Sequence, residues 1–245
     1  MVRLSVILLV FGRLLLFSYG QEKDAFPYPE GEKLFFDLSY GWIKGGEGVM
    51  QYHTVVRDSD TMAVVRAEAH TTGIFSWFSP VEDRSETHFR AEDGYPVRSV
   101  REIRRRGKTS SEELLFLEDN HRIRSSRSGD HLFPVRMYDV LSAFYRARSM
   151  LSRHLPAEGS ILRLPLFFDG KYFDVRVRYD GKEEIRTFEG RKMCYRFVPD
   201  TTGNRTFTDP EQLRIWVTDD GRLLPVRIVA RLPVGSFRCV LTGVQ

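Results

Sequence analysis

The sequence predicts a mainly β protein. We expect one large curved antiparallel sheet, half-barrel or barrel-like, with one helix packed across it. Three observations lead to this class. Most of the chain alternates apolar and polar residues with a period of two, turn residues separate these stretches, and a single segment has helical spacing. Because no helix alternates with the strands, folds built from βαβ units are excluded.

The strands are expected from the alternation. The first, "LFFDLSYGW", places Leu34, Phe36, Leu38, Tyr40 and Trp42 on one face. Alternation is also clear in "KYFDVRVRYD" at 171–180 and in "LLPVRIVARL" at 223–232, and is typical of a sheet with one wet face. Further strands are expected at Glu47–Val56, Met62–Thr72, Val81–Arg90, Val97–Arg105, Ser110–Leu117, Ile161–Phe167, Glu184–Phe188, Lys192–Val198 and Leu213–Thr218.

Two turns share one sequence pattern. "AEDGYPVR" at 91–98 and "TDDGRLLPVR" at 218–227 both read Asp-Gly, a short spacer and Pro-Val-Arg. Asp-Gly favours a tight turn, and the Pro lies where a strand begins and needs no ladder N–H. Both are therefore expected to connect antiparallel strands. The repeat also suggests an internal duplication on either side of the helix, within a single β-rich domain at 21–245.

One segment, "MYDVLSAFYRARSMLSRH", has helical spacing. Val140, Phe144, Ala147 and Leu151 lie three and four residues apart, with no Gly or Pro among them. Asp139 is a suitable N-cap, and a Pro follows soon after the segment. The pattern predicts a helix at Val140–Arg153, laid across the sheet.

Residues 1–20 are typical of a signal peptide. A basic start at Arg3 precedes an apolar run, and the small residues Ser18 and Gly20 fit a cleavage site after Gly20. Arg13 interrupts the run, and the alternative is a buried amphipathic N-terminal helix. No later apolar stretch is long enough to span a membrane. We therefore expect export to the periplasm or envelope of a bacterium, and no transmembrane span in the mature chain.

The composition and motifs exclude several function classes. The net charge of +4 comes from intermixed acids and bases, which favours a solvated surface over nucleic-acid binding. A nucleophile elbow, H-E-x-x-H, a P-loop and a dinucleotide-binding glycine motif are all missing, so no cofactor is predicted. Cys194 and Cys239 are expected on opposite strand faces, where they could not form a disulfide.

Several phrases resemble a bacterial family. "EGEKLFFDLSYGWIKGGEG", "FSPVEDRSETHF", "DGYPVRSVREI", "YDVLSAFYRAR" and "IWVTDDGRLLPVRIVARLPVGSF" are similar to the exported domain of unknown function 3108. The resemblance covers about Phe26 to Thr242 and implies an envelope location and a β-rich fold, without an activity. Family positions fall on Gly31, Glu32, Leu34, Gly45, Asp83, Pro96, Asp139, Leu141, Ser142, Arg148, Trp216, Asp219, Pro225, Gly235 and Leu241.

The candidate site residues form three groups. Phe75, Trp77 and Phe78 are adjacent aromatics in an expected loop, and could act as ligand contacts, a lid, a membrane-contacting tip or a core plug. Arg148, on the border of the helix stripe, is expected to form a structural ion pair with Asp83 or Asp219, or else to contact a ligand. Glu86 and His88 share one strand face and are weak metal-ligand candidates, with His70 or His53 as a third ligand. The alternative for this last group is a solvated strand face.

Three functions are consistent with these patterns. The first is a β-scaffold without enzymatic activity that binds a hydrophobic or amphipathic envelope molecule, such as a lipid or glycan. The second is a hydrolase of cell-wall glycan or lipid that uses Asp83, Glu86 and His88. The third is an interaction subunit that pairs with an envelope protein through its edge strands.

Export gives the first testable prediction. Because residues 1–20 have the basic, apolar and small-residue order of a signal peptide, the protein from an envelope fraction is expected to begin at Gln21. Intact-mass spectrometry reads this N-terminus. A cytosolic protein that retains Met1 would contradict the prediction.

Overall fold

The computed structural model describes residues 28–57, 60–117, 121–200, 212–232 and 235–245. The expected signal peptide at 1–20 lies outside the described residues. None of the helices in the described ranges combines the length and the apolar character needed to cross a membrane.

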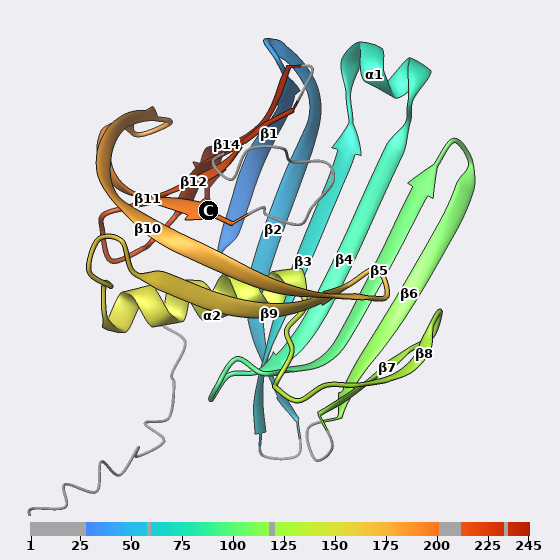
Figure 1. The fold of residues 1–245 in the computed structure, drawn as a ribbon. Coiled ribbons are helices and arrows are strands. Elements are labelled where there is room, and N and C mark those ends of the chain that lie inside the picture. Colours follow the sequence, from blue (N-terminus) through green and yellow to red (C-terminus); the bar gives the residue numbers. More distant parts are fainter. Residues whose placement is uncertain (1–27, 58–59, 118–120, 201–211, 233–234) are drawn as a thin grey trace, which may run out of the picture.

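Fourteen antiparallel strands form one sheet (Figure 1). Its strands are β1 (Lys33–Tyr40), β2 (Ile43–Arg57), β3 (Asp60–Thr71), β4 (Val81–Arg90), β5 (Pro96–Arg105), β6 (Lys108–Leu117), β7 (Arg122–Ser125), β8 (Gly129–Leu132), β9 (Ile161–Phe168), β10 (Lys171–Thr187), β11 (Gly190–Pro199), β12 (Leu213–Thr218), β13 (Pro225–Arg231) and β14 (Ser236–Val244). The helices are α1 (Gly73–Phe78) and α2 (Val140–Arg153). The predicted fold class is confirmed.

The sheet order is β8-β7-β6-β5-β4-β3-β2-β1-β14-β13-β12-β11-β10-β9. The first and last strands therefore pair in the middle of the sheet, while β8 and β9 are its edges. The segment between them, which contains α2, joins the two edges, and the sheet curves around the helix (Figure 1).

The segment that joins the two edges also pairs with the edge strand β9. The Tyr138 N–H donates to the carbonyl of Pro165 at 2.9 Å, and the Phe167 N–H donates to the carbonyl of Tyr138 at 2.8 Å. Nearby, the side chain of Arg127 pairs with Asp169 at 3.2 Å. These contacts give an incompletely closed, barrel-like shape in which the edges are partly covered.

The core consists of three clusters on the inside of the curve. The first surrounds Tyr145 of α2 and includes Leu34, Tyr52 and Phe89. The second lies under β6 and β7, around Phe116 and Phe167. A third packs the C-terminal strands against the other side of the helix, where Tyr179 and Phe197 meet Ala147 and Leu151. Helix α2 is thus in contact with both halves of the sheet.

Both Asp-Gly segments connect neighbouring strands, as predicted, and both contact α2. The first joins β4 to β5, and the Arg146 side chain donates to the carbonyl of Asp93 at 3.4 Å. The second joins β12 to β13, where Arg148 donates to the carbonyl of Arg222 at 2.7 Å. In each case the register shifts beside the Pro. The repeated pattern therefore forms two turns that hold the helix. Whether it also records a duplication stays a hypothesis.

Three sequence predictions differ from the structure. The expected loop around Phe75 contains the short helix α1. The strands expected at 171–180 and at Glu184–Phe188 are one continuous strand, β10. Its pairing register with β11 shifts between Tyr179 and Lys182, and the pairing then continues. Strands β7 and β8 were not predicted, because segments of four residues give too short a pattern.

Helix α2 has the predicted bounds and the predicted N-cap. The Asp139 carboxylate accepts hydrogen bonds from the N–H groups of Leu141 and Ser142, and the Ser142 hydroxyl completes a capping box. The hydroxyl of Thr87 on β4 also donates to Asp139, at 2.8 Å. The cap therefore fixes the start of the helix to the sheet beneath it.

Asp139 gives a prediction about pH. Burial raises the pKa of its carboxyl above the ordinary 3.8, although the hydrogen bonds from Ser142, Thr87 and Leu141 oppose the rise. Because this pKa is higher in the folded state than in the unfolded state, the carboxyl contributes its full stabilisation at pH values below the unfolded-state pKa. This contribution is lost as the pH rises through the folded-state pKa. Asp139→Asn keeps a capping acceptor but does not titrate. We expect the stability advantage of the wild type over the variant to shrink as pH rises above about 4.

Urea unfolding of both proteins at a series of pH values measures this advantage. A difference that stays constant, or that grows with pH, would contradict it.

Candidate functional site

A cavity of about 500 Å³ lies between the inner face of the sheet and the N-terminal half of α2. Strands β1 to β6 form its floor, and β9, β13 and β14 contribute further walls. The volume falls within the ~300–1,000 Å³ of typical ligand pockets. This cavity defines the candidate site.

Most of the cavity wall is apolar. Phe36 and Leu38 of β1, Ala67 and Ala69 of β3 and Phe167 of β9 face the cavity, together with Ile228, Cys239, Val140, Leu141 and Phe144. Of the last three, Val140 and Phe144 belong to the predicted apolar stripe of α2, whose other members, Ala147 and Leu151, pack against the third core cluster. That stripe is not the most buried part of the helix: Val140 is 48% exposed, whereas Ser142, Arg148 and Ser149 are fully buried. Leu141 and Phe144 pack against the first core cluster and also line the cavity. Apolar side chains that line a cavity are a feature of ligand-binding sites.

One wall is polar. On β4, β5 and β6 the inner face carries Asp83, Ser85, Ser99, Arg101 and Glu112. Asp83 accepts two hydrogen bonds from Arg101, at 2.5 and 3.2 Å, and the guanidinium lies 4.7 Å from the ring centre of Phe168. Glu112 accepts a hydrogen bond from the Ser125 hydroxyl at 2.6 Å. The cavity is therefore amphipathic, with an ion pair and a second carboxylate along one side.

A buried ion pair holds the helix that roofs this cavity. Arg148 donates to both carboxylate oxygens of Glu32, at 2.7 and 3.0 Å, and the two residues are 2% and 3% exposed. Burial by itself would lower the pKa of Arg148, but the hydrogen bonds and charge of Glu32 outweigh it and the pKa is raised. The Tyr28 ring lies 4.3 Å from the guanidinium carbon and covers it. Of the guanidinium nitrogens, Nε alone has no hydrogen-bond partner in the part of the chain that the structure describes.

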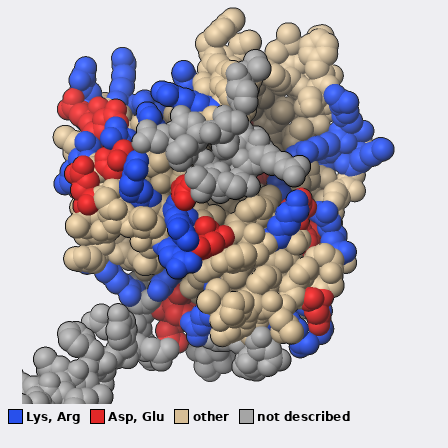
Figure 2. Space-filling model, viewed as in Figure 1, with Lys and Arg blue, Asp and Glu red and all other residues tan. Residues whose placement is uncertain are grey.

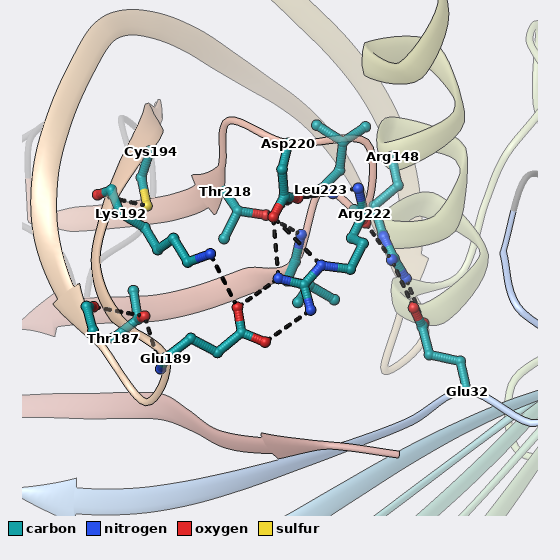
Figure 3. A network of polar contacts seen from close by, with 12 residues as sticks. Glu32, Arg148, Thr187, Glu189, Lys192, Cys194, Thr218, Asp220, Arg222 and Leu223 are labelled. Carbon is teal, nitrogen blue, oxygen red and sulfur yellow. Dashed lines mark hydrogen bonds and ion pairs between the residues drawn. The ribbon is translucent and has the colours of Figure 1, made fainter.

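The network continues beyond the helix (Figure 3). The carbonyl of Arg222 accepts from Arg148, and the Arg222 side chain donates to both oxygens of Glu189, at 2.8 and 2.5 Å. These hydrogen bonds, with those of Lys192, lower the pKa of Glu189 to about 2. Asp220 accepts from the N–H groups of Arg222 and Leu223 and fixes the turn between β12 and β13. The helix, this turn and the β10–β11 turn are thereby connected.

The predicted partners of Arg148 are wrong. Asp83 pairs with Arg101, and Asp219 pairs with Lys182 at 2.6 Å. The partner is Glu32, 116 residues away along the chain, in a turn just before β1. Both Glu32 and Arg148 are among the positions that match the family in the sequence resemblance. That match was the one signal in the sequence from which this ion pair could have been predicted. Arg148 does not line the cavity, since its guanidinium points toward Glu32 (Figure 3).

The other candidates lie apart from the cavity. Phe75 packs against β2, while Trp77 and Phe78 are exposed on α1. Glu86 and His88 lie on the outer face of β4, where Glu86 contacts His88 and Arg66, and these hydrogen bonds outweigh burial and lower its pKa. Asp83 faces inward, so these three residues do not share one site. The described residues hold no group of three ligands suited to a metal ion.

Both cysteines are free thiols. Cys194 is buried beside Trp216, and Cys239 faces the cavity. Burial raises the pKa of Cys194 to about 11 and that of Cys239 to about 12. Neither thiol has the low pKa that marks a reactive cysteine.

The chain is similar to one protein family and to solved structures. The family model described as "Protein of unknown function (DUF3108)" matches residues 36–242. The chain is also similar to the solved structure of a beta-barrel-like protein of domain of unknown function DUF1849 from Brucella abortus, with a TM-score of 0.56 and 12% identity over 89% of this chain and 98% of that one. A DUF1089 family protein from Pseudomonas aeruginosa gives a TM-score of 0.39 and 11% identity over 76% of this chain and 89% of that one. The DUF1849 likeness shows the fold alone. No curated protein matches.

The Glu32–Arg148 pair gives a prediction about stability. Arg148→Ala leaves the Glu32 carboxylate buried without its partner, which typically costs about 3–5 kcal/mol of unfolding free energy. Urea unfolding measures the loss. Arg163→Ala is the matched control, since Arg163 pairs with Asp174 in an exposed position and should change little.

A second variant separates the charge from the packing. Glu32→Leu/Arg148→Met replaces both charges with apolar side chains and should recover part of the lost stability. Wild-type stability in Arg148→Ala would refute the structural role of the pair.

Proposed function

The chain belongs to the DUF3108 family of proteins of unknown function, and we propose that it binds an amphipathic molecule of the bacterial envelope in the cavity under α2. The observation that carries this proposal is the position of Val140, Leu141 and Phe144. These side chains line the cavity at the N-terminal half of the helix, where Val140 is 48% exposed and Leu141 and Phe144 are only partly buried against the core. An apolar ligand in the cavity would complete their burial.

The two kinds of wall suggest how the ligand lies. An apolar chain fits among Phe36, Leu38 and Phe144, and a polar head fits beside Arg101 and Glu112. The hydrogen bonds between Arg101 and Asp83 hold this wall in place before a ligand arrives, which limits the entropic cost of binding. The location of the ligand in the envelope rests on the expected signal peptide.

The proposed function predicts that filling the cavity prevents binding. Ala69 faces the cavity from β3, and Ala69→Phe adds a ring to that space. We expect the variant to bind the apolar fluorescent probe N-phenyl-1-naphthylamine at least about tenfold more weakly than the wild type, because a ring of this size displaces a large part of the apolar contact. Fluorescence titration of delipidated protein measures the affinity.

The matched control is Ser111→Phe, which adds the same ring at an exposed position on β6. It should bind the probe like the wild type. Equal binding by all three proteins, each with a cooperative unfolding transition, would show that the probe does not enter the cavity. Mass spectrometry of solvent extracts from the purified wild type then identifies a natural ligand.

A further inference from the structure

One end of the sheet exposes large apolar side chains. It is the end where β1, β3, β5 and β13 finish, at the top of Figure 1. Trp42, in the β1–β2 turn, is 90% exposed, and Trp77 and Phe78 of α1 are 86% and 71% exposed. Ile74 of α1 is exposed as well. We call Trp42, Ile74, Trp77 and Phe78 the aromatic tip. The two segments form separate projections in Figure 2.

The fold holds α1 in this exposed position. No residue of α1 is buried, and no side chain caps its N-terminus. Phe75 anchors it: its ring lies against Gly45 of β2, where a Cβ would come within 3.0 Å of the ring. A glycine at this position therefore lets α1 rest on the sheet while Trp77 and Phe78 remain outside. Exposed aromatics without core packing mark surfaces that contact a partner or a membrane.

Basic residues lie directly beside the aromatic tip. The β5–β6 turn contains Arg105, Arg106 and Lys108, all exposed, and no ion pair involves them among the described residues. This turn is next to α1, since Arg105 pairs with Val81 at the start of β4 and the Arg106 N–H donates to the carbonyl of Pro80 at 3.3 Å. In Figure 2 the blue side chains over this turn lie to the right of the two projections.

Apart from the β11–β12 connection at 200–212, which contains Asp200, Asp209 and Glu211 and lies mostly outside the described residues, the turns of this end are 41–43, 72–80, 105–108 and 231–236. The sequences of these four turns include no Asp or Glu. Their net charge is therefore positive. We propose that this end of the protein docks on an anionic lipid bilayer. Trp side chains favour the interface between headgroups and acyl chains, and adjacent Lys and Arg attract anionic headgroups. The combination of projecting aromatics and unpaired bases fits a lipid surface better than a flat protein interface.

The apolar inner face connects this end to the cavity. Phe36 and Leu38 of β1 line the cavity, and Tyr40 follows them on the same face. On β14, Leu38 pairs with Cys239 and Tyr40 pairs with Phe237. A molecule that leaves a bilayer at the tip would meet this apolar path toward the cavity. Docking itself does not require that the cavity holds a ligand, so the two proposals fail independently.

Vesicle flotation tests the docking. The protein used begins at Gln21, which keeps every described residue and removes the apolar leader segment. The wild type is expected to float with vesicles of phosphatidylcholine mixed with phosphatidylglycerol, and not with phosphatidylcholine alone.

Two variants separate the apolar from the charged contacts. Trp77→Ser/Phe78→Ser should weaken vesicle binding at least about tenfold through lost apolar contact. Arg105→Gln/Arg106→Asn/Lys108→Gln should weaken it on the order of a hundredfold. Asn is chosen because Arg106 has a positive φ of 47°.

Val56→Ser is the matched control, since it removes an exposed apolar side chain from the last residues of β2, at the opposite end of the sheet. It should float like the wild type. Tryptophan emission provides a second readout, because Trp42 and Trp77 are exposed while Trp216 is buried. Anionic vesicles should shift the emission to shorter wavelengths, and less so in Trp77→Phe.

Three results would overturn the proposal: no flotation of the wild type with anionic vesicles, equal flotation with both vesicle types, or unchanged flotation of both tip variants. A tip that serves a protein partner gives the first of these results. Probe binding in the cavity should be the same in the tip variants as in the wild type, which separates this test from that of the proposed function.

Discussion

Glu32 and Arg148 form the buried ion pair on which the position of α2 depends. Glu32 precedes the central strand β1, and Arg148 lies on the helix that joins the two edges of the sheet. Two buried charges are costly to desolvate, and the bidentate geometry and the covering Tyr28 ring offset that cost. Because the same guanidinium reaches the carbonyl of Arg222, one side chain connects the beginning of the sheet, the helix and the C-terminal strands.

This arrangement explains why a cavity exists. Asp139 at the start of α2 accepts a hydrogen bond from Thr87 of β4, and Arg148 donates to Glu32 just before β1. These two bonds fix the orientation of the helix relative to the sheet. In this orientation Val140, Leu141 and Phe144 line the cavity, although Leu141 and Phe144 also pack against the first core cluster. The sheet matches this asymmetry, since small residues on β3 leave room while Arg101 and Glu112 provide a polar side. A protein that needed only stability would fill such a space.

The sequence predicts the local elements well and the long-range contacts poorly. Period-two alternation gave most strands, and Asp139 with the spacing of Val140 to Leu151 gave α2 with its observed bounds. Alternation identifies the face of a strand, but not whether that face meets a core or a cavity, so Phe36 and Leu38 could be assigned inward without revealing the site. Arg148 was paired with acids near predicted turns of the sheet, because nothing in a single sequence measures the distance to Glu32. Helix α1 was missed because its six residues are too few to show a helical period, and because they begin with Gly73 and are soon followed by Pro80.

The central claim is that the ion pair holds α2 in place and thereby maintains the cavity. Hydrogen–deuterium exchange of Glu32→Gln, followed by mass spectrometry, tests it most directly. The account predicts faster exchange in Val140–Arg153 than in the wild type, slow exchange retained in β3 and β4, and weaker binding of N-phenyl-1-naphthylamine by the same protein. Wild-type exchange throughout α2 together with unchanged probe binding would contradict it.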